Sequence, residues 1–342
     1  MQALYITAPG ATVLRDLAPP KARPGEILLK PRLIGLCGTD LSTFRGKNPL
    51  VSYPRIPGHE IAATIVESGS DVPGEFRPGL NVTLYPNTSC GACASCKRGR
   101  TNACKFNQTL GVQRDGAMAG LFAVAWQKIV EAPRLSLRQL ALVEPLAVGF
   151  HAIERGRVTQ ADTIAILGCG TVGLGALAAA VSRKATTIAV DLDDRKLALA
   201  KRIGAQHVIH SGHASLHGEL QAITGGFGPD VIVEAVGTAA TYRSAVEEVA
   251  HTGRVVYIGW AKEAVNFETS LFVHKELDIL GSRNYLNEFP GVIEVLAKGD
   301  FPVDAAISAT VPLTSAGDAL REWSESPQSF TKILVDMDAT GR

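Results

Sequence analysis

The spacing of hydrophobic residues changes near residue 150 and divides the chain into two parts. Before that point, short runs of β-branched or alternating apolar residues are broken by Gly, Pro and Asn, as at residues 27–29, 61–66 and 81–84. Runs of this length between turn-forming residues are typical of short antiparallel strands joined by irregular loops. The N-terminal part is therefore predicted to be mostly β.

From residue 162 onward, strand-like apolar runs alternate with stretches of helical composition, such as 193–203 and 239–249. This alternation indicates βαβ units and a parallel sheet covered by helices on both faces. The expected strands are residues 163–167, 187–190, 208–209, 231–234, 254–258 and 277–280.

Two further apolar runs, at residues 311–313 and 333–335, are predicted to be strands that return to the first domain. The predicted organisation is an α/β chain of two domains. The first comprises residues 1–148 and 292–342, and the second comprises residues 149–291. A length of 342 residues also favours two domains over one.

Composition and charge limit the kinds of partner. Hydrophobic residues make up 46% of the chain and charged residues 20%, which is typical of a soluble globular protein. A net charge of +1 gives no attraction to nucleic acid or to an anionic membrane. The N-terminus does not read as a signal peptide, and the apolar run 168–181 contains four glycines and is too short to cross a bilayer. We therefore expect a cytoplasmic protein without nucleic-acid or membrane partners.

A glycine-rich segment follows the first strand of the C-terminal domain. Residues 168–173 have the spacing G-x-G-x-x-G, directly after the apolar run 163–167 and before an Ala-rich helical stretch. The pattern alone is weak, but this context is typical of a dinucleotide-binding turn, in which backbone N–H groups and a helix N-terminus receive a pyrophosphate. The alternative is a glycine-rich turn that binds another ligand. The residues expected at the pyrophosphate are Gly168, Gly170, Thr171, Val172 and Gly173.

An acidic residue ends the second strand of this domain. Asp191 lies eighteen residues after Gly173. A carboxylate at this position accepts hydrogen bonds from the adenosine ribose and repels a 2′-phosphate. The sequence therefore predicts NAD rather than NADP as the cofactor. Arg195 lies nearby and would soften this preference.

Four cysteines lie close together in the N-terminal domain. Cys90, Cys93, Cys96 and Cys104 have the spacing C-x2-C-x2-C-x7-C. Four thiolates this close can complete a tetrahedral zinc shell without a ligand from elsewhere in the chain. Iron–sulfur clusters also use four cysteines but with other usual spacings, and disulfides are disfavoured in the cytoplasm. We predict a structural zinc site that leaves no position for a substrate.

The other candidate metal ligands are scattered: Cys37, His59, Glu60 and Glu144. A catalytic zinc needs about three protein ligands and one position open to water or substrate. Cys37 and His59 supply sulfur and nitrogen, and Glu60 or Glu144 supplies oxygen. Because His59 and Glu60 are adjacent, a regular strand would point them to opposite faces. Either one of them leaves regular geometry, or Glu60 binds the metal weakly or only transiently. Taken singly, Cys37, His59 and Glu144 also fit structural roles: a buried thiol, a core histidine and a charge at a helix N-terminus.

In their order along the chain, these motifs resemble those of the zinc-dependent medium-chain dehydrogenase/reductase family, close to its sorbitol, polyol, aldonate and threonine dehydrogenases. Gly-Leu-Cys37-Gly-Thr39-Asp40 is similar to the family's first zinc-ligand motif, and Pro-Gly-His59-Glu60 to its second. The four-cysteine lobe, Glu144 and the segments 168–173, 234–237 and 280–283 follow in the family's order. The resemblance covers nearly the whole chain.

The resemblance implies a GroES-like, mostly β catalytic domain that holds zinc, and a Rossmann domain, a doubly wound parallel sheet, that holds NAD. It places the active site in the cleft between them and implies a homodimer or homotetramer. Thr39 is expected to pass the substrate's proton towards the cofactor ribose, and Asp40 to orient His59. Further residues expected to contact NAD are Val236, Gly237, Ile258, Gly259, Ser282, Arg283 and Lys332, with Lys332 reaching the pyrophosphate.

One position departs from the resemblance. Related threonine and polyol dehydrogenases often have a histidine three residues after the threonine, where this chain has Ser42. A serine does not hold a proton near neutral pH, so the proton must leave through another relay or through water.

The expected reaction is hydride transfer from a secondary alcohol of a polyol or sugar acid to NAD+. Arginines that pair with a carboxylate would favour a sugar acid such as galactonate or gulonate. The expected substrate contacts are Phe44, Arg114 and Asn284. The alternatives are an L-threonine 3-dehydrogenase, which Ser42 disfavours, and a non-catalytic NAD-binding sensor or structural protein, which the presence of Cys37, His59 and Thr39 disfavours.

Overall fold

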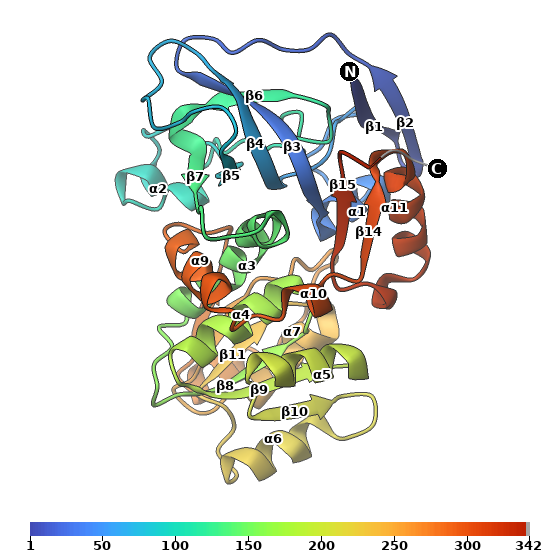
Figure 1. Cartoon of the computed structure of the whole chain (residues 1–342). Coiled ribbons are helices and arrows are strands. Elements are labelled where there is room, and N and C mark those ends of the chain that lie inside the picture. The colour runs from blue at the N-terminus through green and yellow to red at the C-terminus, as the bar shows by residue number, and fades with distance from the viewer. Residues whose placement is uncertain (340–342) are drawn as a thin grey trace. The chain divides into compact units, whose positions relative to one another are not determined.

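The computed structural model describes residues 1–339, which form two compact units (Figure 1). The first unit contains Met1–Glu144 and the segment from Ile307 onward, and the second contains Pro145–Ala306. The boundaries lie at 144/145 and 306/307, where the sequence predicted 148/149 and 291/292. The difference arises because helices α9 (Phe289–Lys298) and α10 (Val303–Ala306) lie in the second unit, and helix α3 (Leu137–Arg155) runs across the first boundary.

The first unit is built on a seven-stranded sheet with the order β14-β15-β3-β4-β5-β7, and β6 pairs with β3 beside this path. Its pairings are antiparallel except for β14 with β15. In Figure 1 the red strand β15 lies beside the blue strand β3, with which it pairs antiparallel. The strands are β3 (Glu26–Leu36), β4 (Glu60–Ser68), β5 (Asn81–Leu84), β6 (Phe122–Ala125), β7 (Ile129–Glu131), β14 (Ala309–Pro312) and β15 (Ile333–Asp336).

Strand β3 organises the core of this unit. Its residues Ile27, Leu29, Ile34 and Leu36 are fully buried and pack in one apolar cluster with Ile61 of β4. A central strand buried on both faces reads as a nearly continuous apolar run. The helices of the unit besides the start of α3 are α1 (Gly38–Phe44), α2 (Ala94–Lys97) and α11 (Ala316–Glu325), and a hairpin is formed by β1 (Gln2–Ala8) and β2 (Ala11–Asp16).

The second unit is a six-stranded, entirely parallel sheet with the order β10-β9-β8-β11-β12-β13. The strand order reverses between β8 and β11, and ligands of such sheets bind beyond the carboxyl ends of the strands at this point. The strands are β8 (Thr163–Leu167), β9 (Thr186–Asp191), β10 (His207–His210), β11 (Val231–Glu234), β12 (Arg254–Tyr257) and β13 (Asp278–Gly281). The connecting helices are α4 (Thr171–Ser182), α5 (Asp194–Ile203), α6 (Leu216–Thr224), α7 (Ala239–Glu248) and α8 (Ser270–His274).

Short 3-10 turns complete the fold at Thr101–Ala103, Trp126–Lys128, Leu313–Ser315 and Pro327–Ser329. Within residues 1–339, no helix has both the length and the apolar character that a membrane span requires.

Candidate active site

Antiparallel pairing of β3 with β4 brings the first candidate ligands together. Gly35 of β3 lies opposite Glu60 of β4, so Cys37, just after β3, is close to His59, just before β4. The ligand atoms of Cys37, His59 and Glu60 all lie within 4.8 Å of one another. His59 follows Gly58, whose φ of +100° is favourable for glycine, and lies outside the strand. The expected break in regular geometry therefore falls at His59.

Asp40 supports this cluster from helix α1. Its Oδ2 accepts a hydrogen bond of 2.9 Å from the backbone N–H of Cys37, which is the N-cap of the helix. Its Oδ1 lies 4.0 Å from Nδ1 of His59, and the carboxylate is completely buried. Burial lowers the pKa of His59, but the neighbouring Cys37 and Asp40 outweigh it, and the pKa lies well above its usual value. The cluster therefore favours positive charge.

Lys332, which is expected at the cofactor pyrophosphate, lies beside the first candidate metal cluster. Its Nζ lies 2.7 Å and 2.6 Å from the two carboxylate oxygens of Glu60, and its contact with the cofactor stays a prediction. Lys332 also donates to the carbonyl oxygen of Leu36 at 3.0 Å. Lys332 is 4% exposed, so this ion pair with Glu60 of the candidate metal cluster is buried.

Glu144 is buried on helix α3, and its carboxyl group interacts electrostatically with the same cluster. Burial raises its pKa to about 7, an effect that the charge of His59 opposes and that of Glu60 supports. Glu144 is not part of the group formed by Cys37, His59 and Glu60, whose ligand atoms all lie within 4.8 Å of one another. Thr39 lies in the first turn of α1, two residues after Cys37.

The four-cysteine segment forms a second cluster, around helix α2. The sulfur atoms of Cys90, Cys93, Cys96 and Cys104 lie within 4.8 Å of one another. Sγ of Cys93 is 3.5 Å from Sγ of Cys96 and 3.9 Å from that of Cys104, and a tetrahedron of thiolates around zinc needs separations of about 3.8 Å. A hydrogen bond from Ser95 lowers the pKa of Cys93 to about 5, while burial raises that of Cys96 to about 11.

The glycine-rich turn lies at the carboxyl end of β8, beside the switch in strand order. Gly168 has a φ of +99°, and a Cβ at Gly173 would lie only 1.8 Å from the carbonyl oxygen of Gly168. Both positions therefore need glycine. A Cβ at Gly170 would meet nothing within 4 Å, so the N-terminus of α4 has open space beside it. Such a helix N-terminus favours a phosphate group.

Asp191 is fixed at the end of β9. Its Oδ2 accepts from the backbone N–H of Cys169 at 2.7 Å, and its Oδ1 accepts from those of Leu192 and Asp193 at 2.7 Å and 3.0 Å. The carboxylate is thus held beside the glycine-rich turn. Arg195 is 73% exposed, and its guanidinium pairs with Asp193 at 2.8 Å.

The other residues expected at the cofactor follow β11, β12 and β13 at the same edge of the sheet. The backbone N–H groups of Ile258 and Gly259 both donate to the carbonyl oxygen of Glu234. Oγ of Ser282 is buried and has no hydrogen-bond partner in the part of the chain that the structure describes. Val236 and Gly237 follow β11, and Arg283 follows β13.

The expected substrate contacts belong to both units. Phe44 is 4% exposed and packs in the apolar core of the first unit, and its contact with a substrate stays a prediction. Arg114 lies in an exposed loop of the first unit, and Asn284 follows β13 in the second unit with a φ of +50°. Arg45, another arginine near the first motif, donates from Nε to Oγ of Ser324 at 2.9 Å.

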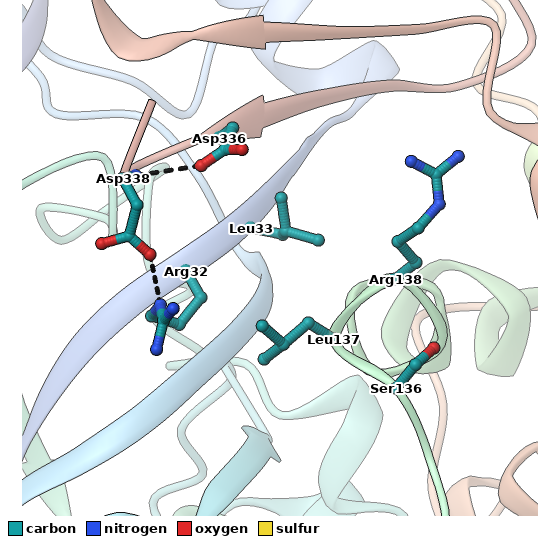
Figure 2. Close-up of a pocket in the computed structure, with 7 residues that line it drawn as sticks. All are labelled: Arg32, Leu33, Ser136, Leu137, Arg138, Asp336 and Asp338. Carbon is teal, nitrogen blue, oxygen red and sulfur yellow. Dashed lines mark hydrogen bonds and ion pairs between the residues drawn. The ribbon is translucent and has the colours of Figure 1, made fainter. Parts of the chain in front are cut away.

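A separate hollow of about 440 Å³ lies in the first unit between β3, α3 and the end of β15 (Figure 2). Figure 2 shows Asp338 bonded to the side chain of Arg32, while its backbone N–H donates to Asp336 at 3.0 Å. Lys30 also pairs with Asp338, at 2.7 Å. Its lining contains none of the metal-cluster or glycine-turn residues, so this hollow is not the candidate active site.

Two family models match the chain: an alcohol dehydrogenase GroES-like domain at residues 23–134 and a zinc-binding dehydrogenase domain at residues 171–298. The sorbitol dehydrogenase of Bacillus subtilis (strain 168) is 33% identical over 94% of this chain and 93% of its own length. The L-galactonate-5-dehydrogenase of Escherichia coli (strain K12) is 29% identical over 93% and 94%. The chain belongs to the zinc-binding alcohol dehydrogenase family. The resemblance inferred from the motifs is thereby confirmed.

Solved structures of this family have the same fold. A short chain alcohol dehydrogenase from Escherichia coli CFT073, complexed with NADH, superposes with a TM-score of 0.90 at 28% identity, covering 98% of this chain and 99% of that one. A zinc-binding dehydrogenase from Sinorhizobium meliloti 1021, bound to NADP, gives 0.89 at 29% identity with the same coverage. The predicted GroES-like and Rossmann fold and the enzyme class, a zinc-type dehydrogenase, are confirmed.

Sequence reasoning missed two buried groups. It did not foresee the contact of Lys332 with Glu60. It also gave Glu234 no role, although Glu234 is completely buried at the carboxyl end of β11. The signal for Glu234 was an acidic residue at the end of an apolar run, three residues before Gly237. Such a charge is costly to bury unless it is hydrogen-bonded.

Proposed function

We propose that the protein transfers a hydride from a secondary alcohol of a polyol or sugar acid to NAD+. The observation that carries the proposal is the convergence of Cys37, His59 and Glu60 within 4.8 Å. Sulfur, imidazole nitrogen and carboxylate oxygen form a donor set that suits a catalytic zinc. The family's polyol and sugar-acid dehydrogenases, such as the two relatives above, support this class of substrate.

Each residue of the first cluster has a distinct proposed role. Cys37 and His59, with Glu60 or Glu144, would hold the catalytic zinc, which when bound supplies Lewis acidity for alcohol oxidation. Asp40 would orient His59 through the 4.0 Å approach of its Oδ1 to Nδ1. Thr39 would accept the substrate's hydroxyl proton. Because Ser42 cannot store this proton, another relay or water would carry it away.

The second unit would bind NAD at the carboxyl edge of its sheet. The fit rests on the close approach of Gly173 to Gly168, the open space beside Gly170, and the buried Oγ of Ser282, which lacks a partner among residues 1–339. Asp191 would accept the ribose hydroxyls and disfavour NADP. The residues proposed to contact NAD are Gly168, Gly170, Thr171, Val172, Gly173, Asp191, Arg195, Val236, Gly237, Ile258, Gly259, Ser282, Arg283 and Lys332.

The four cysteines would hold a structural zinc, because their four sulfurs fill a tetrahedral shell. A zinc stoichiometry of about two per chain is therefore expected, one ion for each cluster.

The decisive experiment follows NADH formation by absorbance with zinc-loaded protein and a panel of polyols, aldonates and L-threonine, with parallel NADP+ reactions. Activity on a polyol or aldonate that depends on NAD+ supports the proposal. Turnover of L-threonine alone would replace the substrate class and keep the chemistry. A lack of turnover across the panel, with about two zinc ions bound, would favour a non-catalytic NAD-binding role.

We further propose that the protein works in the cytoplasm as a homodimer or homotetramer. Strand β13 is the last strand of its sheet, and Ile279 on it is 42% exposed, while Val273 of α8 is 84% exposed. An edge strand with exposed apolar side chains is suited to pairing with a second copy. Light scattering coupled to size-exclusion chromatography tests this, because a monomer at micromolar concentration would contradict it. In the cytoplasm the clustered thiols would stay reduced.

A further inference from the structure

Glu234 lies at the point of the second sheet where the strand order reverses. It is the last residue of β11 and pairs in register with Leu167 of β8 on one side and Tyr257 of β12 on the other. Its side chain is completely buried. A carboxylate buried here needs hydrogen-bond donors from neighbouring groups, because an uncompensated buried charge is costly.

The carboxylate holds the turn that follows β11. Its Oε1 accepts hydrogen bonds from the backbone N–H groups of Val236 at 2.9 Å and Gly237 at 2.7 Å. It also accepts from Oγ1 of Thr241 at 2.7 Å, in the first turn of α7. Charge-assisted bonds of this kind are stronger than neutral ones, so the position of the turn is tightly defined.

The same residue also holds the segment that follows β12. The backbone carbonyl of Glu234 accepts from the N–H groups of Ile258 at 2.9 Å and Gly259 at 3.0 Å. A Cβ at Gly259 would lie 2.4 Å from Oε2 of Glu234, so the backbone of this segment packs directly on the carboxylate. The hydroxyl of Tyr242 donates to the carbonyl oxygen of Gly259, and Tyr242 stacks on Tyr257 at 4.1 Å.

One oxygen of this carboxylate stays unsatisfied. Oε2 is buried and makes no hydrogen bond to any residue that the structure describes. Burial accordingly raises the pKa of Glu234. An apolar residue would avoid this cost in a strand that is otherwise Val231, Ile232 and Val233. We therefore attribute the presence of a carboxylate here to Oε1, whose hydrogen bonds fix the turn after β11.

We propose that Glu234 is a positioning residue for the nicotinamide half of the cofactor. It joins the turn of Val236 and Gly237 to the segment of Ile258 and Gly259, and these four residues are among those proposed above to contact NAD. The inference rests on that proposed function. Asp191, which is proposed to contact the adenosine half, is fixed by separate hydrogen bonds from the backbone N–H groups of Cys169, Leu192 and Asp193.

The test compares two ligands of the zinc-loaded protein: NADH, and ADP-ribose, which lacks the nicotinamide. Glu234→Ala is expected to weaken NADH binding about tenfold while changing the dissociation constant of ADP-ribose by less than about twofold. Glu234→Gln, which keeps one acceptor oxygen, should give a smaller change in the same direction, and it serves as the test if the alanine variant does not fold.

Asp162→Asn is the matched control. Asp162 is a buried carboxylate that directly precedes β8 at the opposite edge of the same sheet, where it accepts from the backbone N–H of Thr159 at 2.6 Å. It is expected to lower stability and leave the ratio of the two dissociation constants unchanged. If the Glu234 variants lose the same affinity for both ligands, or lose affinity for neither, the inference is overturned. Wild-type protein that binds neither ligand would instead overturn the proposed function.

Discussion

Lys332 and Glu60 are a buried ion pair, with Nζ 2.6 Å and 2.7 Å from the two carboxylate oxygens. Glu60 is 1% exposed and Lys332 is 4% exposed. The carboxylate of Glu60 contacts Lys332 and also lies within 4.8 Å of the ligand atoms of Cys37 and His59, so a zinc ion in the cluster would share Glu60 with Lys332. The pair thus couples the C-terminal strand β15, which begins at Ile333, to the metal cluster.

Removing the lysine alone should destabilise the protein. Lys332→Met leaves the carboxylate of Glu60 buried without its cation, and breaking such a pair costs about 3–5 kcal/mol. We expect a loss of this size in the metal-free protein and a smaller loss when zinc is bound, because the ion would neutralise Glu60. Urea unfolding with and without zinc measures both values.

The matched control removes both charges. Glu60→Gln/Lys332→Met contains no uncompensated charge and is expected to recover most of the lost stability in the metal-free protein. Equal stability of Lys332→Met and the wild-type protein would show that the pair does not compensate Glu60.

The four-cysteine cluster makes a prediction about metal content. Cys93→Ser should lower the zinc stoichiometry from about two to about one per chain, because a three-thiolate shell is incomplete. Cys169→Ser is the control: Cys169 is the chain's one cysteine outside the two candidate metal clusters, it is buried, and burial raises its pKa well above the usual range. Metal analysis after desalting reads out both variants. If Cys93→Ser leaves the zinc stoichiometry unchanged, the prediction that this cluster binds zinc is wrong.

The fold was predictable where apolar runs are long and regular. The strands at residues 163–167 and 231–234 were predicted with the bounds that the structure has, because buried parallel strands are almost entirely apolar. Long-range pairing was not predictable. Lys332 and Glu60 are 272 positions apart, and only the adjacency of β15 and β3 brings them together. The packing of Phe44 in the apolar core was not predictable either, because a single aromatic residue in a short helix does not show which side of the helix is buried.

Cofactor preference should respond to the ion pair of Arg195 with Asp193. Asp193→Ser keeps a good N-cap for α5 but releases the guanidinium, which is then available to a 2′-phosphate. An exposed ion pair is worth up to about 1 kcal/mol, so the ratio of kcat/KM with NADP+ to that with NAD+ should rise by about fivefold or less. The double variant Asp193→Ser/Arg195→Ala should return to the original ratio. If the double variant keeps the increase, Arg195 is not its cause.

The buried contact of Glu288 with His151 predicts how stability depends on pH. Oε1 of Glu288 lies 2.7 Å from Nδ1 of His151, and Oε2 accepts from the backbone N–H groups of Leu286 and Asn287 at 2.5 Å and 2.9 Å. Burial raises the pKa of Glu288, but the hydrogen bonds from His151 and Leu286 outweigh it and hold the pKa below its ordinary value of 4.5.

A carboxyl group whose pKa is lower in the folded than in the unfolded chain contributes its full stabilisation above the unfolded value. That stabilisation is lost as the pH falls below about 4.5 and through the folded value. Glu288→Gln should therefore be less stable than the wild-type protein by about 1.5–3 kcal/mol at pH 7, and the difference should shrink below pH 4.5. Glu154→Gln, which alters a more exposed carboxylate on α3, should show a smaller difference at pH 7. Urea unfolding across this pH range decides the matter, because a difference that stays constant with pH would mean that the charge of Glu288 is not what stabilises the contact.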